Sequence, residues 1–378
     1  MIIERLTISN FRNYRDADVR PSPDLNVLYG DNAAGKTNML EAIIVASTGR
    51  SPRASRDSEM VRWNEGGFHV RAQVCGNGGS SDLEVGCDIS GKKIVRVNGQ
   101  EKRVGDLLAR LNTVSFLPDD ILVVKGSPAR RRRLLDLTLS QGSQGYHYHL
   151  LQYQRILLHR NALLRDLAVR RRTSDVGSLV EPWDRQIAKV GAFIVERRKA
   201  ALTVLSTAAA AAYSRMSGGE LLLVKYAPSI PLDDGDDADA ISRRMLGCLE
   251  ECRGEDIRHG ATSVGPHRDD ISFQVNGSDA RLFGSQGQQR TVILAVKAAE
   301  IQFLKSKNGE APVLLLDDVF SELDDARQAS VAREMAAGLQ CFITCTEMDR
   351  IEDMVDDASL YRVRAGEVAA IDAHQGCS

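Results

Sequence analysis

One glycine-rich stretch decides the fold of this chain, and it reads Gly30-Asp31-Asn32-Ala33-Ala34-Gly35-Lys36-Thr37. Two glycines separated by four residues and followed by Lys-Thr form the pattern of a phosphate-binding loop. Glycine lets the backbone wrap closely around a phosphate, and the loop amides then point at the anion. We therefore expect Lys36 to reach the β and γ phosphates of a nucleotide, and the Thr37 hydroxyl to bind Mg²⁺.

The residues on both sides of this loop fit the strand and the helix that a phosphate-binding loop joins. Leu25–Tyr29 is predicted to be a buried strand, and apolar residues recur at helical spacing after the loop. We expect a helix over Lys36–Thr48, with Gly49 at the end position that favours a left-handed backbone. Asn38, in the first turn of this helix, completes the predicted nucleotide-binding loop.

A second motif is the apolar run Val313–Leu316, which is followed by Asp317 and Asp318. Four consecutive apolar residues are typical of a strand buried on both faces of a parallel sheet, and ligands bind at the carboxyl ends of such strands. We expect Asp317 to hold the Mg²⁺, directly or through water, and Asp318 to activate the attacking water as a general base. Together with Lys36, these carboxylates form the predicted catalytic set.

A third motif, Gly284–Arg290, is predicted to be a loop that opens a helix. Its amides, the Ser285 hydroxyl and the helix N-terminus would form another anion site. One γ-phosphate does not need two such sites in one lobe. We therefore expect a head-to-tail homodimer, in which this loop closes over the nucleotide held by the other protomer.

The order of the predicted elements indicates an α/β fold interrupted by a helical insertion. Strands dominate the first part of the chain, a helical pattern extends from about Lys125 to Gly260, and strands return after it. We expect the two ends, residues 1–120 and 300–378, to form one ATP-binding lobe with a parallel or mixed sheet. Residues 121–299 are expected to form a mainly helical lobe that carries the third motif.

Several individual elements can also be predicted. One strand is predicted over Val19–Tyr29, directly before the phosphate-binding loop. A long helix is predicted over Tyr146–Arg172. A second long helix is expected to start at Pro182, because proline suits the first turn of a helix. A further helix is expected over Ala326–Leu339, after the second motif.

The charge of the chain is unevenly distributed. Its 378 residues have a formal net charge of −2, but Lys125–Arg215 contains 17 Lys and Arg against 6 Asp and Glu, an excess of +11. The rest of the chain therefore carries −13. Such asymmetry indicates a polyanion partner for the basic part.

Arginine runs in this basic region are candidate DNA contacts, although a charge run is more commonly a solvated face. The runs are Arg130-Arg131-Arg132-Arg133, Arg170-Arg171-Arg172 and Arg197-Arg198-Lys199. Few aromatic residues lie near them, so contact with the phosphate backbone of a duplex is favoured over base stacking.

The sequence also argues against several classes of protein. It has neither a predicted signal peptide nor an apolar run of the ~18 residues that a membrane helix needs. Its seven cysteines are scattered without a C-x-x-C pair, which is typical of reduced thiols. We expect a cytoplasmic protein without a membrane partner.

Together these motifs resemble the ATP-binding cassette family, and specifically its SMC-like branch. Besides the phosphate-binding loop, the resemblance is carried by the runs Asn10–Tyr14, Gly265–Asp270, Ser285–Arg290 and Leu316–Asp324. Within this branch the sequence is most similar to a bacterial recombination mediator. The resemblance implies an ATPase that dimerises on ATP, hydrolyses it slowly with Mg²⁺ and binds double-stranded DNA and single-strand/double-strand junctions. It also implies companion mediator proteins and roles in recombinational repair, replication restart and the SOS response.

The same resemblance implies roles for individual residues. Ser285, Gly287 and Gln288 would be signature residues, Arg12 would contact a phosphate, and Ser321–Asp324 would be the D-loop. The family has a glutamate at the position of the proposed general base. The shorter aspartate of this chain is consistent with slow hydrolysis.

Two residues of the family pattern have no clear counterpart in this chain. The glutamine of the Q-loop is absent near Pro118, where Asp119 or Asp120 could replace it. The switch histidine is also absent, and Thr344 or Thr346 could take its position.

Two other functions compete with this interpretation. One is a cassette ATPase subunit that drives a membrane protein or another complex, and the basic helical insertion argues against it. The other is a small-molecule P-loop kinase, which would have no use for the third motif.

Overall fold

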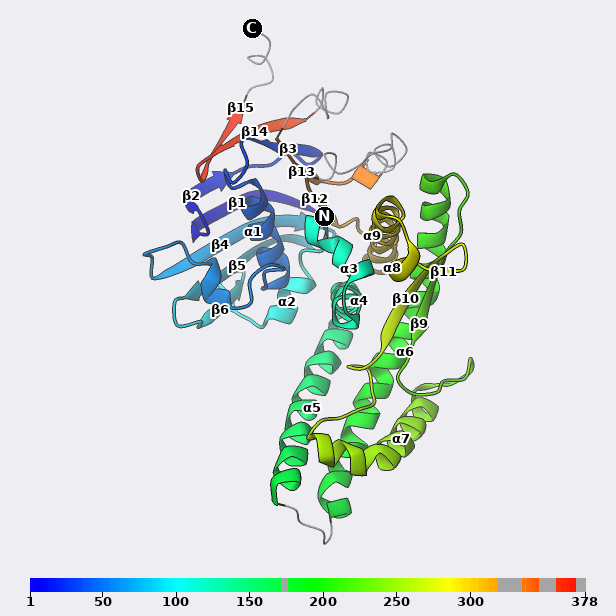
Figure 1. Ribbon diagram of the computed structural model, residues 1–378. Helices are drawn as coiled ribbons and strands as arrows, with labels where there is room; N and C mark the ends of the chain where they lie inside the picture. The colour runs from blue at the N-terminus through cyan, green and yellow to red at the C-terminus, as the bar shows by residue number, and fades with distance from the viewer. Residues whose placement is uncertain (171–175, 319–334, 337, 347–357, 372–378) are drawn as a thin grey trace. The chain divides into compact units, whose positions relative to one another are not determined.

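The structure is a computed structural model, and it describes residues 1–170, 176–318, 335–336, 338–346 and 358–371 (Figure 1). The chain folds as two compact units. Unit 1 comprises Met1–Asp120, Ala212–Gly219 and Ile293–Ser378, and unit 2 comprises Ile121–Ala211 and Glu220–Val292.

A six-stranded sheet of unit 1 carries the phosphate-binding loop. Its strand order is β15-β14-β3-β13-β12-β8, and every neighbouring pair is parallel except β14 and β15. The strands are β3 (Leu25–Tyr29), β8 (Thr113–Phe116), β12 (Val313–Asp317), β13 (Cys341–Cys345), β14 (Ser359–Arg364) and β15 (Glu367–Ile371). Because β13 lies between β3 and β12, the carboxyl ends of these three strands meet at one edge of the sheet.

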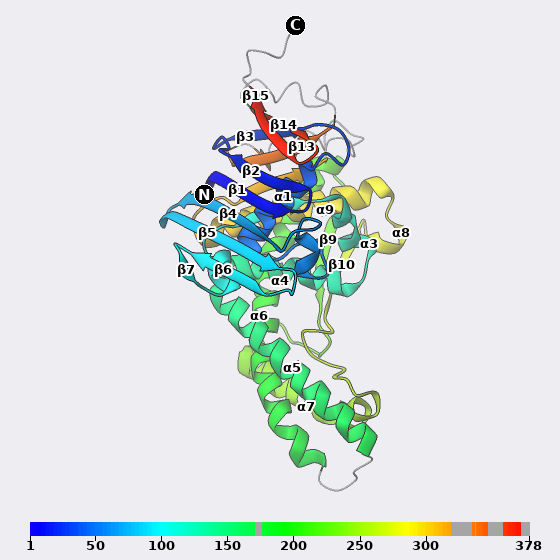
Figure 2. The same ribbon diagram turned by 90° about the vertical axis from the view of Figure 1, so that its left-hand side faces the viewer.

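The second sheet of unit 1 is antiparallel, with the order β2-β1-β4-β5-β6-β7 (Figure 2). Its strands are β1 (Ile2–Phe11), β2 (Tyr14–Val19), β4 (Gly67–Gly76), β5 (Gly79–Asp88), β6 (Lys93–Val97) and β7 (Gln100–Glu101). Buried residues alternate with more exposed ones along β4. This alternation is typical of a strand that buries only one face.

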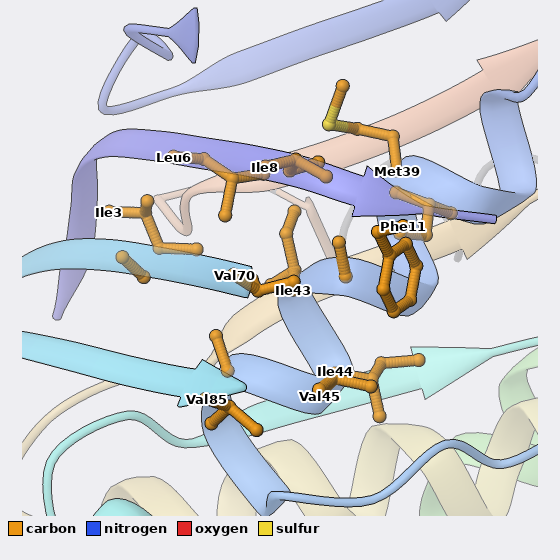
Figure 3. Close-up of a cluster of buried hydrophobic side chains, with 14 of the residues drawn as sticks. Ile3, Leu6, Ile8, Phe11, Met39, Ile43, Ile44, Val45, Val70 and Val85 are labelled. Atoms are coloured by element: carbon orange, nitrogen blue, oxygen red, sulfur yellow. The ribbon is translucent and has the colours of Figure 1, made fainter. Parts of the chain in front are cut away.

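Helix α1 (Lys36–Thr48) contacts strands of both sheets. Figure 3 shows Ile43 and Ile44 of α1 among apolar side chains of β1, β4 and β5. The same buried cluster includes Leu315 of β12 from the parallel sheet. The helix ends at Gly49, whose φ of 66° is left-handed, as its sequence predicts. Since α1 follows the phosphate-binding loop directly, this packing fixes the end of the loop.

Unit 2 is mainly helical, with a small three-stranded sheet in the order β11-β10-β9. Its main helices and strands are α4 (Pro128–Gly142), α5 (Gln144–Arg170), α6 (Val176–Ser217), β9 (Leu222–Ala227), α7 (Ala238–His259), β10 (Asp270–Val275), β11 (Ser278–Asp279), α8 (Ala280–Phe283) and α9 (Gln286–Asn308). The last residues of α6 and most of α9 belong to unit 1. Both views show α5 and α6 running side by side (Figures 1 and 2).

A buried arginine joins three long helices of unit 2, α5, α6 and α7. Arg160 of α5 is fully buried and donates to Asp184 of α6 and Asp256 of α7, each at 2.8 Å. Arg253 of α7 donates to the same Asp184 at 2.9 Å. Breaking a buried ion pair leaves an uncompensated charge in the interior, so this network fixes the register of the helices.

The shorter elements complete the chain order. They are η1 (Asp57–Met60), α2 (Val104–Leu108), η2 (Pro118–Asp120) and α3 (Ile121–Lys125).

Some predicted boundaries are wrong. The chain turns back after β1 and forms β2 before β3, so Val19–Tyr29 is not one strand. Helix α6 begins at Val176, and Pro182 lies inside it rather than at its start. Strands β9 and β15 were not predicted. Most of the helix predicted over Ala326–Leu339 lies outside the described residues.

Candidate nucleotide-binding site

The backbone of the phosphate-binding loop requires glycine at both ends. Gly30 has a φ of 151°, and a Cβ atom there would lie 2.2 Å from the backbone oxygen of Val363. Gly35 has a φ of 124°, and its Cβ would lie 2.7 Å from Nδ2 of Asn13. Any larger residue would therefore push the loop away from the strands behind it.

Lys36 lies over the start of the loop. Its Nζ atom donates to the backbone oxygens of Gly30 at 2.5 Å and Asp31 at 2.9 Å, and the residue is 8% exposed. These bonds hold the ammonium group inside the curve of the loop. A cation in this place suits the β and γ phosphates of a nucleotide.

A second layer of residues holds the loop from behind. Asn13 Nδ2 donates to the backbone oxygen of Ala34 at 2.8 Å, and the Tyr14 hydroxyl donates to that of Gly35 at 2.9 Å. Asn38 Nδ2 donates to Asn13 Oδ1 at 2.8 Å and so connects α1 to the same layer. Sequence reasoning assigned no role to Asn13 or Tyr14, although the Asn10–Tyr14 run carried part of the family resemblance.

Asp317 lies at the carboxyl end of β12, where it meets two hydroxyl groups. The Thr37 hydroxyl donates to its Oδ1 atom at 2.9 Å and the Thr344 hydroxyl at 2.7 Å. Burial raises the pKa of the Asp317 carboxyl, and the hydrogen bonds from Thr344 and Thr37 act in the opposite direction. The structure thus brings the predicted Thr37 and Asp317 together.

These oxygen atoms suit a magnesium ion. Mg²⁺ prefers oxygen ligands and is commonly held by one or two protein oxygens together with substrate phosphates and water. The Thr37 hydroxyl and the Asp317 carboxylate are two such oxygens, and both adjoin the phosphate-binding loop.

Asp318 has a left-handed backbone, with a φ of 51°. Its N–H donates to the Thr344 hydroxyl at 2.9 Å. Thr344 therefore contacts both aspartates. Its hydroxyl accepts from the backbone N–H of Asp318 and donates to the side chain of Asp317. Left-handed backbone at a non-glycine residue is uncommon and concentrates at functional sites.

Arg12 is held within the protein. It makes two hydrogen bonds to the carboxylate of buried Glu41, at 3.0 and 2.6 Å, and a third to the backbone oxygen of Glu59 at 2.8 Å. Its side chain is 22% exposed, so part of the guanidinium surface faces solvent. The predicted phosphate contact of Arg12 stays a prediction.

A cleft of about 540 Å³ opens beside the loop within unit 1. Its lining consists of Arg12, Asn13, Asn38, Glu59, Val61, Arg62, Trp63 and Asn64. Asn38 directly follows the loop in sequence, and Asn13 donates to the loop oxygen of Ala34, so the cleft adjoins the phosphate-binding loop.

The third motif lies in unit 2 and opens a helix. The chain enters α9 at Gln286, so 286–290 is helical and the prediction of a loop over this stretch is wrong. Ser285 Oγ accepts from Gln288 N–H at 3.1 Å, and Gln288 Oε1 accepts from Ser285 N–H at 3.0 Å. This reciprocal capping satisfies backbone donors at the helix start. Ser285, Gln286 and Gly287 are exposed.

The arginines of α4 have different surroundings. Arg131 is 3% exposed and donates to Asp270 at 2.7 and 3.1 Å. Arg132 donates to the backbone oxygen of Asp269 at 2.7 Å. Arg130 and Arg133 are exposed. Arg131 therefore lies in the interior and is removed from the set of candidate DNA contacts.

The other arginine runs show a similar pattern. Arg198 is 2% exposed and donates to both carboxylate oxygens of Asp136, at 2.9 and 3.0 Å, whereas Arg197 is exposed. Arg171 and Arg172 lie outside the described residues, as does the side chain of Arg170.

Acidic partners reduce the charge excess of the basic region. Asp256, Asp269 and Asp270 pair with arginines from the basic region and follow it in sequence. Over the whole of unit 2, 24 Lys and Arg oppose 19 Asp and Glu, a difference of +5. The Gly265–Asp270 run is therefore partly structural, since it supplies counter-charges to the buried arginines.

The remaining candidates from the family pattern can also be placed. Asp120 accepts from the backbone of Leu117 at 2.8 Å and lies 3.8 Å from the buried Lys297, whereas Asp119 is exposed. Thr346 is exposed. The predicted D-loop, Ser321–Asp324, lies outside the described residues.

Comparison with known proteins identifies the family. A family model described as the RecF/RecN/SMC N terminal domain matches residues 2–369. Over 98% of its length the chain is 43% identical to the DNA replication and repair protein RecF of Symbiobacterium thermophilum, and it covers 99% of that protein. The chain belongs to the RecF family.

Solved structures agree with this assignment. The chain matches a structure of the recombination mediator protein RecF-ATP in the RecFOR pathway with a TM-score of 0.89 and 34% identity, covering 98% of this chain and 97% of the other. It also matches the Smc head domain of Pyrococcus furiosus with a TM-score of 0.57 and 18% identity, over 99% and 97% of the two chains. The second likeness shows the fold alone. The predicted ATP-binding cassette head of the SMC type is confirmed.

Within the described part of this RecF-family chain, none of the helices combines the length and the apolar character that crossing a bilayer requires.

Proposed function

We propose that this RecF-family chain is an ATP-dependent DNA-binding protein of recombinational repair, replication restart and the SOS response. One observation carries the proposal: the phosphate-binding loop, Thr37, Asp317 and the strained Asp318 come together around Thr344. Such a site suits ATP hydrolysis. The similarity to a RecF that was solved with ATP supports ATP as the nucleotide.

In this proposal the loop residues bind and orient the triphosphate. Amides of Gly30–Thr37 and the Lys36 ammonium hold the β and γ phosphates. Thr37 and Asp317 would hold Mg²⁺, which neutralises charge that develops on the phosphate oxygens. Asp318 accepts the proton of the water that attacks the γ-phosphorus. Its side chain is shorter than glutamate and holds that water less closely, so we propose that hydrolysis is slow and acts as a switch.

The second half of the site comes from a second copy of the chain. Ser285 and Gly287 lie exposed at the start of α9, where the helix dipole favours an anion. We propose that they cover the γ-phosphate held by the partner copy, with Gln288 fixing the Ser285 backbone. ATP then links two copies, and hydrolysis releases them.

Exposed arginines of unit 2 are the proposed DNA contacts. Arg130 and Arg133 of α4 are exposed, and so are Arg155 and Arg165 of α5. Pairing two copies doubles the number of phosphate contacts, so DNA affinity should depend on ATP. The predicted Arg170-Arg171-Arg172 run remains part of this proposal.

The relatives support the proposed wider biological role. The RecF structures are described as part of a RecFOR pathway. We propose RecO-type and RecR-type mediators as partners, and double-stranded DNA with single-strand/double-strand junctions as substrates, in the cytoplasm. DNA is proposed to stimulate the ATPase.

Fluorescence anisotropy of a labelled duplex tests the proposal. Binding should tighten about 10-fold or more with a non-hydrolysable ATP analogue, and Lys36→Ala should abolish that gain. The salt dependence should become less steep by about one unit of log–log slope for each phosphate contact removed, as in Arg130→Gln or Arg133→Gln. Equal affinity with and without nucleotide would exclude ATP-gated DNA binding.

A further inference from the structure

Two of the most exposed aromatic side chains in the described chain lie beside the two halves of the proposed nucleotide site. Trp63 is 90% exposed and lines the cleft beside the phosphate-binding loop. Phe283 is 74% exposed and precedes Ser285 by two residues, next to Leu282 at 63%. Large apolar side chains that are this exposed mark an interaction surface when they adjoin a functional site.

We propose that Phe283 of one copy packs against Trp63 of a second copy and closes the cleft over the nucleoside. The contact rests on the proposed ATP-linked dimer and deepens it. It adds an apolar contact to an interface that otherwise consists of phosphate, amides and hydroxyl groups. We propose a second copy of this chain as the partner, because the exposed Leu282 and Phe283 directly precede the Ser285 turn that the proposed dimer already uses.

The local structure holds Phe283 in place for such a contact. Asp279 accepts from the backbone N–H groups of Arg281 and Leu282, at 2.7 and 3.3 Å, and so caps the short helix α8. Gly284 N–H donates to Ala280 at 3.2 Å, and the buried Gln289 side chain donates to the same oxygen at 2.8 Å. Phe283 therefore projects from a fixed turn rather than from a free loop.

The distances along the chain agree with the contact. Two residues span at most ~7 Å, so a partner that places Ser285 on the phosphates carries Phe283 to within that distance of them. On the receiving copy, Asn38 directly follows Thr37 and lines the same cleft as Trp63. Aromatic pairs of this kind favour edge-to-face or offset-stacked packing.

Tryptophan fluorescence tests the contact directly. The chain has two tryptophans, so Trp183→Phe leaves Trp63 as the only one and keeps a ring against His159. With a non-hydrolysable ATP analogue, Trp63 emission should shift to shorter wavelength as the protein concentration rises through the dimerisation range. ADP should give no shift that depends on protein concentration.

Truncation of either ring gives an independent measurement in the unaltered background. Phe283→Ala and Trp63→Ala should each weaken ATP-dependent dimerisation about 10-fold by light scattering. Their double variant should lose little more than either single variant, because both remove one shared contact. Leu179→Ala is the matched control, since Leu179 is 46% exposed in α6 of unit 2 and should leave dimerisation unchanged.

The outcomes separate this contact from the dimer itself. If the parent protein dimerises with ATP but both ring variants dimerise normally, the Trp63–Phe283 contact is wrong and the proposed function stands. A Trp63 shift that is equal at all protein concentrations, or equal with ADP, means that the nucleotide base covers the indole and also overturns the contact. If the parent protein stays monomeric, the proposed function fails first.

Discussion

Thr344→Val removes the hydroxyl that joins the two carboxylate residues of the site. Valine has nearly the same shape, but it can neither donate to Asp317 nor accept from Asp318 N–H, at the present distances of 2.7 and 2.9 Å. A hydrogen bond to a charged group contributes about 1.5–3 kcal/mol, and a buried donor left unpaired costs about 1–3 kcal/mol. Because Thr344 is 2% exposed and water cannot replace the hydroxyl, we expect a loss of about 2–4 kcal/mol in the free energy of unfolding.

Two measurements test this prediction. Urea unfolding gives the free energy of unfolding, and an ATPase assay gives the turnover rate. Turnover should fall at least about 10-fold, because Asp317 loses one of its two hydroxyl donors and Asp318 loses the bond that fixes its left-handed backbone. Thr344→Ser keeps the hydroxyl and should restore most of both properties. Thr346→Val is the control, since Thr346 is exposed just beyond β13. A Thr344→Val protein within about 0.5 kcal/mol of the parent and with normal turnover would refute the reasoning.

Three further predictions test other parts of the site and of unit 2. Asp318→Asn should slow phosphate release about 100-fold or more while ATP still binds, because a general base contributes that much; unchanged turnover would remove Asp318 from this role. Tyr14→Phe should weaken ATP binding several-fold, measured by calorimetry, because the loop loses its bond to the Gly35 oxygen; an unchanged dissociation constant would show that this bond does not position the loop. Burial lowers the pKa of His267 to about 4, whereas the unfolded chain takes up this proton near 6.5, so stability should fall by about 3 kcal/mol as the pH drops from 6.5 to 4. His267→Gln should remove that part of the pH dependence in urea titrations, and an identical pH profile would contradict the assignment.

The parallel sheet and the phosphate-binding loop could be predicted from the sequence because local chemistry determines them. Two glycines at fixed spacing are required by φ values of 151° and 124°, and the apolar run of β12 fits a strand buried on both faces. The helix after the loop begins and ends where its sequence predicts. In these segments, local propensity and tertiary packing favour the same structure.

Residues that act through tertiary contacts could not be found in this way. Tyr14 and Asn13 approach the loop only because β1 and β2 form a hairpin, and the sequence analysis did not predict that hairpin. Thr344 was considered only as a switch residue, because its bonds to Asp317 and Asp318 depend on the order of the strands in the sheet. Spatial neighbours that are far apart in sequence leave no local pattern.

The arginine runs show the same limit for charge. Counting residues gives the basic region an excess of +11, but part of its counter-charge comes from Asp256, Asp269 and Asp270, outside that region. A run of like charges on a helix also places successive residues on different faces, which is why Arg131 is buried while Arg130 is exposed. The sequence alone predicts that this region is positively charged, but it does not predict which of its arginines are exposed.

Size-exclusion chromatography with light scattering tests the shared nucleotide most directly. The 41.4 kDa chain should double its mass with a non-hydrolysable ATP analogue and return to one copy with ADP. Ser285→Arg should bind the analogue with unchanged affinity and remain at the mass of one copy. A parent protein that stays monomeric at saturating analogue and high protein concentration, or a Ser285→Arg variant that dimerises normally, would contradict the account.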